Sequence, residues 1–326
     1  MIISRTPLRM SFVGGGSDLP QFYREHGGAV LSTAIDKYIF VTANKKFDSG
    51  VRLAYSITEN VDSACDIQHP LARKIIEYTG IPGGIEITTV ADIPSAGTGL
   101  GSSISFAVGL LNVLYAFQDR FASPRTLAEA ACHVEIDLLK EPIGKQDQYA
   151  AAYAGLCLYE FNHDDSVTIT PIIMSRAKKT ELAKRIIMFY TGVTRSASSI
   201  LAAQAEAISS NKAKISNMKR MVELTFVLRQ ALHEGDLDSF GEILNENWEL
   251  KKTMAQGITN SSIDSTYQVA LDAGATGGKI LGAGAGGFFI FYAHEDSHDA
   301  IERALMPMRR IPFCFEEVGS RVIFAG

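Results

Sequence analysis

The stretch PSAGTGLGSSISF at residues 94–106 has the clearest chemical potential in this sequence. Three glycines and two serines stand directly ahead of an apolar helix pattern. Glycines take backbone angles that a Cβ would forbid, so their N–H groups can turn towards a bound anion. Ser102 or Ser103 then suits the first turn of a helix, whose N–H groups and dipole favour phosphate. We interpret the stretch as a phosphate-binding loop; the alternative is a turn that lets strand and helix pack closely.

Arg9, Glu135 and Asp147 are charged residues that could complete such a site. Asp147 lies in Gly-Lys-Gln-Asp-Gln-Tyr at a predicted helix start, which favours a helix aimed at a polar cavity. Each residue also has a structural interpretation. Asp147 could cap a helix beginning at Gln148, Arg9 could be a solvated strand residue, and Glu135 could face water on an amphipathic helix.

A run of three glycines, Gly14 to Gly16, follows a predicted strand and precedes Ser17 and Asp18. The pattern indicates a backbone that must come close to something, with two polar side chains presented just beyond it. Asp18 could alternatively cap a short helix over residues 19–26.

The sequence GGKILGAGAGG at residues 277–287 resembles two nucleotide-binding motifs and fits neither. Gly282, Gly284 and Gly287 match Gly-x-Gly-x-x-Gly, but a strand pattern follows where the dinucleotide fingerprint needs a helix. Ala273 and Ile280 occupy positions where a P-loop requires glycine and Ser or Thr. The remaining parts suit phosphoryl transfer, which needs positioned amides, oxygen ligands for Mg²⁺ and one base.

Periodicity predicts the elements that must position these residues. Strands are expected at 2–13, 29–34, 38–43, 51–54, 85–90, 156–161, 167–173, 186–190, 288–292, 311–318 and 321–324. Helices are expected at 19–26, 70–78, 104–117, 124–139, from 148, from 178, across 196–252 with a break at Gly235, and at 295–306. The closing strand–helix–strand–strand order predicts an α+β layer separate from the first domain.

The composition is that of an ordinary soluble globular protein. The length of 326 residues predicts two domains, and the composition is 46% hydrophobic and 21% charged. The net charge of −5 favours neither nucleic acid nor an anionic membrane as partner. No signal peptide or membrane-spanning run is evident, so we expect a cytoplasmic protein. The four scattered cysteines predict neither disulfides nor a zinc site, and each is expected to be a small buried hydrophobe.

Three ordered blocks resemble the signature motifs of the GHMP kinases: RTPLRMSFVGGGSD at 5–18, Pro-x₃-Gly-x-Gly-Leu-Gly-Ser-Ser at 94–103 and KILGAGAGG at 279–287. The resemblance implies an α+β, two-domain GHMP kinase fold. Residues 1–175 would form an N-terminal mixed β-sheet domain with helices, and residues 176–326 a ferredoxin-like α+β domain with added helices. ATP and Mg²⁺ would be the cofactors and a small sugar phosphate the acceptor, with a homodimer as an open option.

The same resemblance implies roles for matching residues. Asp147 would be the catalytic aspartate, Arg9 the basic residue at the reacting groups, and Glu135 with Ser103, or with Ser102, the Mg²⁺ ligands. The ATP phosphates would be bound by Pro94, Gly97, Thr98, Gly99, Leu100, Gly101, Ser102 and Ser103. The acceptor would contact Gly15, Gly16, Ser17, Asp18, Lys145, Gln148, Arg195, Gly284 and Ala285.

Two stretches, GKQDQYAAAY at 144–153 and YTGVTRSASS at 190–199, resemble the heptose 7-phosphate kinases, which phosphorylate an anomeric hydroxyl. We hypothesise that Lys145 and Arg195 bind the remote phosphate of such an acceptor. Another sugar 1-kinase, similar to fucokinase or galactokinase, and a catalytically silent ligand-sensing relative are the alternatives. A dehydrogenase is a more distant one.

Overall fold

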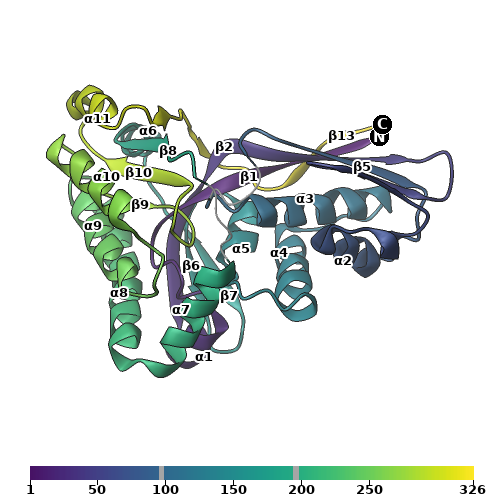
Figure 1. Ribbon diagram of the computed structural model, residues 1–326, viewed down its shortest axis with the longest axis horizontal. Helices are drawn as coiled ribbons and strands as arrows, with labels where there is room; N and C mark the ends of the chain where they lie inside the picture. The colour runs from purple at the N-terminus through teal and green to yellow at the C-terminus, as the bar shows by residue number, and fades with distance from the viewer. Residues whose placement is uncertain (95–98, 194–197) are drawn as a thin grey trace.

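The protein is described by a computed structural model covering residues 1–94, 99–193 and 198–326. A large sheet follows the order β13-β1-β2-β5-β3-β4 (Figure 1). The strands β6 and β12 also pair with β2, and β7 pairs with β6. Its strands are β1 Ile2–Val13, β2 Gly28–Lys45, β3 Val51–Ala54, β4 Thr58–Val61, β5 Ile85–Ala91, β6 Leu156–Phe161, β7 Val167–Pro171, β12 Phe315–Glu316 and β13 Arg321–Ala325. The runs predicted at 29–34 and 38–43 are thus one long strand, β2, which pairs with β6 near its start and with β5 near its end.

In the first half of the chain, one face of this sheet is covered by α2 Pro70–Thr79, α3 Ser102–Phe117, α4 Pro124–Cys132 and α5 Gln146–Tyr153 (Figure 1). The short helix α1 Pro20–His26 lies apart from these helices, beyond the end of β1. The helix α3 approaches β1 closely, because Ser4 Oγ donates to Gly109 O at 2.8 Å and a Cβ at Gly109 would lie 2.8 Å from Thr6 Oγ1. The apolar face predicted for this helix is buried, and it fixes the position of the helix start at Ser102.

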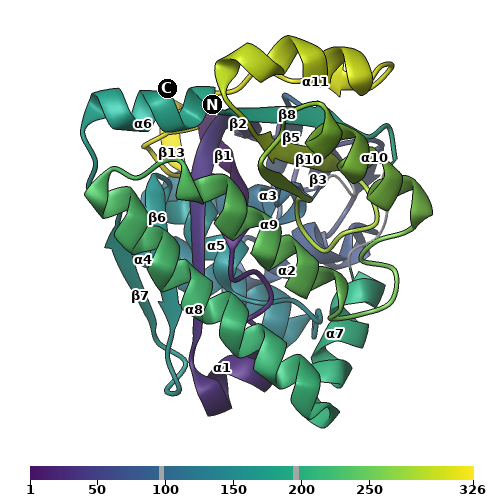
Figure 2. The same cartoon turned by 90° about the vertical axis from the view of Figure 1, so that its left-hand side faces the viewer.

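The second half is built on a smaller antiparallel sheet of order β11-β8-β10-β9. Its elements are α6 Arg176–Lys184, β8 Ile186–Tyr190, α7 Ser198–Ser210, α8 Lys212–Glu234, α9 Ser239–Lys252, α10 Ser261–Asp272, β9 Gly277–Ile280, β10 Phe288–Tyr292, α11 His298–Ala304 and β11 Arg309–Arg310. Figure 2 shows α8 and α9 running beside each other. Leu228 and Leu244 bury in the core of the large sheet, whereas Met218 and Trp248 bury in a second core with the small sheet. The two helices therefore tie the halves together.

The α+β class is confirmed, but the prediction of a closing layer separate from the first domain was wrong. The last strands return to the large sheet, where β12 pairs with β2 and β13 pairs with β1 from Ile2↔Ala325 to Arg5↔Arg321. This pairing gives the outer N–H and C=O groups of β1 a partner. The division of the chain near residue 175 stays a prediction.

Three smaller differences concern local structure. The helix predicted over 124–139 is α4 followed by a π-helical segment, His133–Leu138, and the elements β4, β9, β11 and α10 were not predicted. The four cysteines are free, as expected, but only Cys132 and Cys157 are buried; the prediction of burial was wrong for Cys65 and Cys314, which are exposed. Among the described residues, no helix has the length and apolar character needed to cross a bilayer.

Candidate active site

Arg9 and Asp147 form a bidentate ion pair at the centre of the site. Arg9, on β1, donates from Nε to Asp147 Oδ1 at 2.7 Å and from Nη2 to Oδ2. The Arg9 side chain is 6% exposed and the Asp147 side chain 19% exposed, so the carboxylate keeps an open side. Asp147 lies in the first turn of α5 and caps nothing, since α5 begins at Gln146 and its N-cap residue makes no side-chain cap. The cap interpretation of Asp147 and the solvated interpretation of Arg9 were both wrong.

The described part of the glycine loop contacts both members of this ion pair. Arg9 Nη1 donates to Gly99 O at 2.6 Å, and the Arg9 backbone N–H donates to Leu100 O at 3.2 Å. A Cβ at Gly101 would lie 3.3 Å from Asp147 Oδ2, and Gly101 has a φ of +74°. The loop therefore ends at α3 with its N-terminal N–H groups beside the ion pair, which is an arrangement that suits an anion.

Individual residues of this loop differ in their surroundings. Ser103 is exposed in the first turn of α3, whereas Ser102 and Leu100 are buried and Pro94 is exposed at the far end. Gly97 and Thr98 lie outside the described residues, so their expected contacts stay predictions.

The third glycine-rich motif packs against the loop from the other half of the chain. A Cβ at Gly99 would lie 2.2 Å from Leu281 O, and one at Gly282 would lie 2.6 Å from Gly99 Cα. Further along, Ala285 N donates to Ile258 O at 2.9 Å with Ala285 at a φ of +66°, and Gly284 leaves no room for a side chain against Ile258. Three segments that are far apart in the sequence, at Gly99, at Ile258 and at residues 281–285, thus meet through their backbones.

Glu135 is buried and not solvated, so the interpretation of it as a water-facing carboxylate was wrong. It lies in the π-helical segment that follows α4, where it is 3% exposed, and its Oε2 accepts a hydrogen bond from Gln148 Nε2 at 3.0 Å. Burial raises the pKa of Glu135 to about 8, the Gln148 hydrogen bond opposes that shift, and the negative charge of Asp147 adds to it. π-helical turns are rare and frequently occur at functional sites, and this one carries the buried Glu135 side chain.

The turn at Gly14–Gly16 is held by its own polar side chains. Asp18 accepts hydrogen bonds from Gly16 N and Gln146 N, both at 3.1 Å, so it connects the turn to the start of α5 and is not a cap for α1. Ser17 Oγ donates to Ala29 O at 2.9 Å and accepts from Ala29 N at 3.0 Å. Both side chains are buried, and the structure gives them positioning contacts inside the protein.

Three polar residues from the second half of the chain hydrogen-bond to this turn or to the end of β1 just before it, and the sequence interpretation assigned none of them a role. Asn247 Oδ1 accepts from Gly14 N at 3.1 Å, Lys251 Nζ donates to Gly15 O at 3.0 Å, and Lys279 Nζ donates to Phe12 O at 3.2 Å. All three side chains are buried. Burial lowers the pKa of Lys251 to about 8 and that of Lys279 to about 7, where the positive charges of Lys251 and Arg9 add to the effect.

The burial of Lys279 predicts that the stability of the protein depends on pH. The folded protein holds the Lys279 proton less tightly than the unfolded chain does. The free-energy cost of burying the charged ammonium is therefore full below pH 7 and falls as pH rises towards the unfolded pKa near 10.5. We expect Lys279→Met to raise the free energy of unfolding by about 2–3 kcal/mol more at pH 6 than at pH 9. Urea unfolding at both pH values measures the difference. The exposed Lys219→Met on α8 is the control, and an equal gain at both pH values would contradict the prediction.

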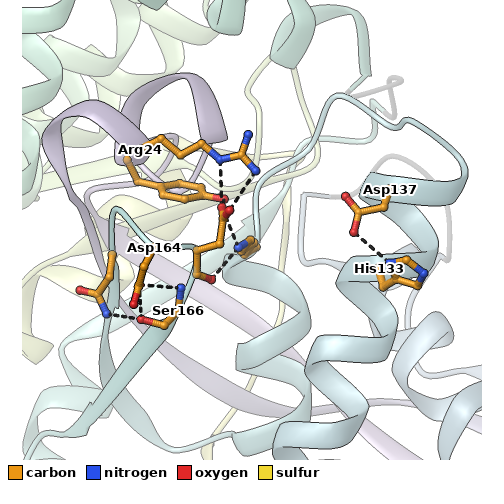
Figure 3. Close-up of polar contacts among 9 residues, drawn as sticks. Arg24, His133, Asp137, Asp164 and Ser166 are labelled. Carbon is orange, nitrogen blue, oxygen red and sulfur yellow. Dashed lines mark hydrogen bonds and ion pairs between the residues drawn. The ribbon is translucent and has the colours of Figure 1, made fainter.

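The ammonium group of Lys145 is paired with Asp165. Its Nζ donates to Asp165 O at 2.7 Å and lies 3.4 Å from Asp165 Oδ1, while Arg24 forms a bidentate pair with the same carboxylate. Figure 3 shows Arg24 beside the hairpin tip that carries Asp164 and Ser166. These cations lower the pKa of Asp165 to about 2. Arg195 lies outside the described residues, so the pairing of Lys145 with Arg195 on a phosphate stays a prediction.

Together the described residues offer a partly exposed carboxylate, a fixed cation, helix N–H groups and a buried carboxylate, which are group types that phosphoryl transfer can use. No group of three or more His, Cys, Asp or Glu side chains that could hold a metal occurs among residues 1–94, 99–193 and 198–326. A magnesium ion carried by nucleotide phosphates needs only one or two protein ligands, and the Glu135 carboxylate and the serine hydroxyls at the start of α3 are oxygen donors of the type that Mg²⁺ takes.

Comparison with known proteins finds two matching family models. The GHMP kinases N terminal domain matches residues 67–155, and the GHMP kinases C terminal model matches residues 228–307. Together they cover just over half of the chain, and the matched ranges contain the glycine loop, Glu135, Asp147 and the third motif.

Similar proteins match over nearly the whole chain. D-glycero-alpha-D-manno-heptose 7-phosphate kinase of Campylobacter jejuni is 29% identical over 316 residues, which is 93% of each chain. The bifunctional fucokinase/GDP-fucose pyrophosphorylase of Arabidopsis thaliana is 26% identical over 89% of this chain, which spans only 29% of that protein. The crystal structure of a D-glycero-D-manno-heptose 1-phosphate kinase from Bacteroides thetaiotaomicron superposes with a TM-score of 0.83 at 26% identity, over all of both chains.

Proposed function

The chain belongs to the GHMP kinases, and on that premise we propose that it transfers the γ-phosphoryl group of ATP to the anomeric hydroxyl of a sugar phosphate, namely D-glycero-D-manno-heptose 7-phosphate, giving the 1,7-bisphosphate. ATP-dependent phosphotransfer is the chemistry of the family. The choice of acceptor is our proposal, and it is supported by the similarity to a heptose 7-phosphate kinase along 93% of both chains. We expect the enzyme to act in the cytoplasm, where ATP is supplied.

The observation that carries the proposal is the ion pair between Arg9 and Asp147 under the end of the glycine loop. A carboxylate that points at a phosphate-binding helix start is suited to an acceptor hydroxyl on one side and a transferring phosphoryl group on the other. Asp147 would accept the hydroxyl proton from its exposed side. Arg9 would hold that carboxylate in one orientation and place a permanent positive charge beside the developing negative charge.

Mg²⁺ is part of the proposal, with Glu135 and Ser103 as the protein groups that would hold it. When bound, it would neutralise charge on the phosphates of ATP. Glu135 would meet it as a carboxylate, since a cation favours the ionised form that burial disfavours. Ser103 is preferred to Ser102 because it is exposed in the first turn of α3. Gln148, which donates to Glu135, would orient the carboxylate and not contact the sugar.

The names of the similar proteins place the existing phosphate of their acceptors at different carbons, so the experiment must separate them. We expect ADP release, followed in a coupled assay, with heptose 7-phosphate and much less with heptose 1-phosphate, free heptose, mannose, fucose or galactose. Phosphorus NMR of the product should show a second phosphate at C1. Faster turnover of fucose would favour the fucokinase-like alternative. A wild-type enzyme without turnover on any of these acceptors would contradict the proposal and favour the ligand-sensing one.

A further inference from the structure

Two glutamine side chains beside the Gly14–Gly16 turn have buried amide nitrogens without a hydrogen-bond partner. These nitrogens are Gln146 Nε2 on α5 and Gln204 Nε2 on α7, in side chains that are 4% and 0% exposed. A buried donor without an acceptor costs the full loss of its hydration, so native proteins leave few of them. Unpaired donors next to a substrate-binding turn therefore point to acceptor atoms that a ligand would supply.

The orientation of the Gln204 amide is fixed by its neighbour. Gln204 Oε1 accepts a hydrogen bond from Lys251 Nζ at 2.8 Å, and the same ammonium donates to Gly15 O at 3.0 Å. An ammonium group only donates, so the amide atom that faces Lys251 must be the oxygen. The NH₂ group is consequently the part that faces the turn.

The Gln204 amide can lie directly against the turn because Gly16 has no side chain. A Cβ at Gly16 would lie 2.0 Å from Gln204 Nε2 and 3.1 Å from Lys251 Nζ, and Gly16 has a φ of +103°. Any side chain at position 16 would collide with the amide. The space where residue 16 could have presented a polar group to the acceptor is therefore occupied by a residue of the second half of the chain.

Gln146 reaches the turn from the first half of the chain. Its backbone N–H donates to Asp18 Oδ2, its Oε1 lies 4.0 Å from the Cβ position of Gly15, and the next residue is Asp147. The Gly15–Gly16 turn thus has one unpaired amide donor from α5 and another from α7. Neutral amide donors fixed in this way suit the hydroxyl oxygens of a polyol.

We propose that Gln204, held by Lys251, is a specificity-determining residue whose Nε2 donates to a hydroxyl oxygen of the acceptor sugar at the Gly15–Gly16 turn, with Gln146 donating from the α5 side. The proposal rests on the proposed function, because it assumes that the acceptor lies between this turn and Asp147. It assigns acceptor selection to residues of both halves of the chain.

Two substitutions separate this role from a structural one. Gln204→Leu removes the whole amide, whereas Gln204→Glu keeps an oxygen for Lys251 but replaces the NH₂ donor with a second oxygen and adds a negative charge. We expect both variants to raise the KM for heptose 7-phosphate about 10–100-fold, the range for a lost hydrogen bond to a buried group, with kcat and the KM for ATP within about threefold. Glu206→Gln, an exposed position on the same helix, is the matched control and should change nothing. A wild-type acceptor KM in Gln204→Glu would overturn the proposal, since it would show that holding Lys251 is sufficient.

Calorimetric binding of heptose 7-phosphate without ATP keeps this test separate from the proposed function. If wild-type protein turns over another sugar of the acceptor panel, the heptose assignment fails. The ratio of the acceptor KM of each Gln204 variant to that of wild type is then measured with that sugar. If it binds a sugar without transferring phosphate, the kinase proposal fails and the ratio of Kd values decides the role of Gln204. Absence of binding to every sugar of the panel would overturn both.

Discussion

Replacing Asp147 with Asn is expected to lower kcat by about 10²–10⁴-fold, the usual contribution of a positioned general base, while ATP still binds. An amide cannot take the proton of the acceptor hydroxyl. It also cannot accept both hydrogen bonds that Arg9 now donates to the two carboxylate oxygens. The described part of the glycine loop is held to Arg9 through Gly99 O and Leu100 O, and Asp147→Asn leaves Arg9 in place, so the phosphate-binding surface should persist. The measurement is kcat from ADP release, with the Kd for ATP from calorimetry.

Asp137→Asn is the matched control for this substitution. Asp137 is a carboxylate of the π-helical segment that contains Glu135, but it is exposed and pairs with His133 at 2.9 Å (Figure 3). Its loss should change kcat by less than about twofold, as surface ion pairs contribute little. Retention of a tenth or more of kcat in Asp147→Asn would sink the assignment of Asp147 as the base.

The parts of the site that could be predicted from sequence are those whose chemistry is local. Glycines at 99, 101 and 282 all have positive φ angles, and at 99 and 282 backbone contacts also exclude a Cβ, so their spacing in the sequence reports the loops directly. The motif around Asp147 singled it out, but the local pattern could not separate a site carboxylate from a helix cap. The contact that separates the two interpretations is the ion pair with Arg9, which lies 138 positions away in the chain.

The residues that sequence reasoning missed owe their role to tertiary packing. Asn247 and Lys251 are one turn apart on α9, where polar side chains normally face water, and only the approach of β1 turns them into partners of the glycine turn. Ser17 shows the converse. Its place after three glycines favoured a ligand contact, but its hydroxyl is used by Ala29 of the neighbouring strand. Neither the contacts of Asn247 and Lys251 nor that of Ser17 could be predicted from the ten or so residues around each of them.

Replacing Arg9 with Lys is the second change for which we expect a large effect, a loss of about 10²–10³-fold in kcat, the cost of removing one fixed donor from a charged transition state. Lysine keeps the positive charge but not the planar fork. The guanidinium now makes two bonds to Asp147 and a third to Gly99 O at 2.6 Å, a geometry that a single ammonium cannot reproduce. Because Gly99 O would lose this partner, the KM for ATP should also rise, which distinguishes Arg9→Lys from Asp147→Asn.

The double variant Arg9→Lys/Asp147→Asn tests whether the pair acts as one unit. If Arg9 serves catalysis mainly by orienting Asp147, the arginine has little left to contribute once the carboxylate is gone. The double variant should then be about as slow as Asp147→Asn alone, within about threefold, and not slower by the product of the two effects. Additive losses would mean that Arg9 acts on the transferring phosphoryl group independently of Asp147. The ratio of the four kcat values therefore decides between a positioning and a direct electrostatic role for a residue that the geometry places in reach of both.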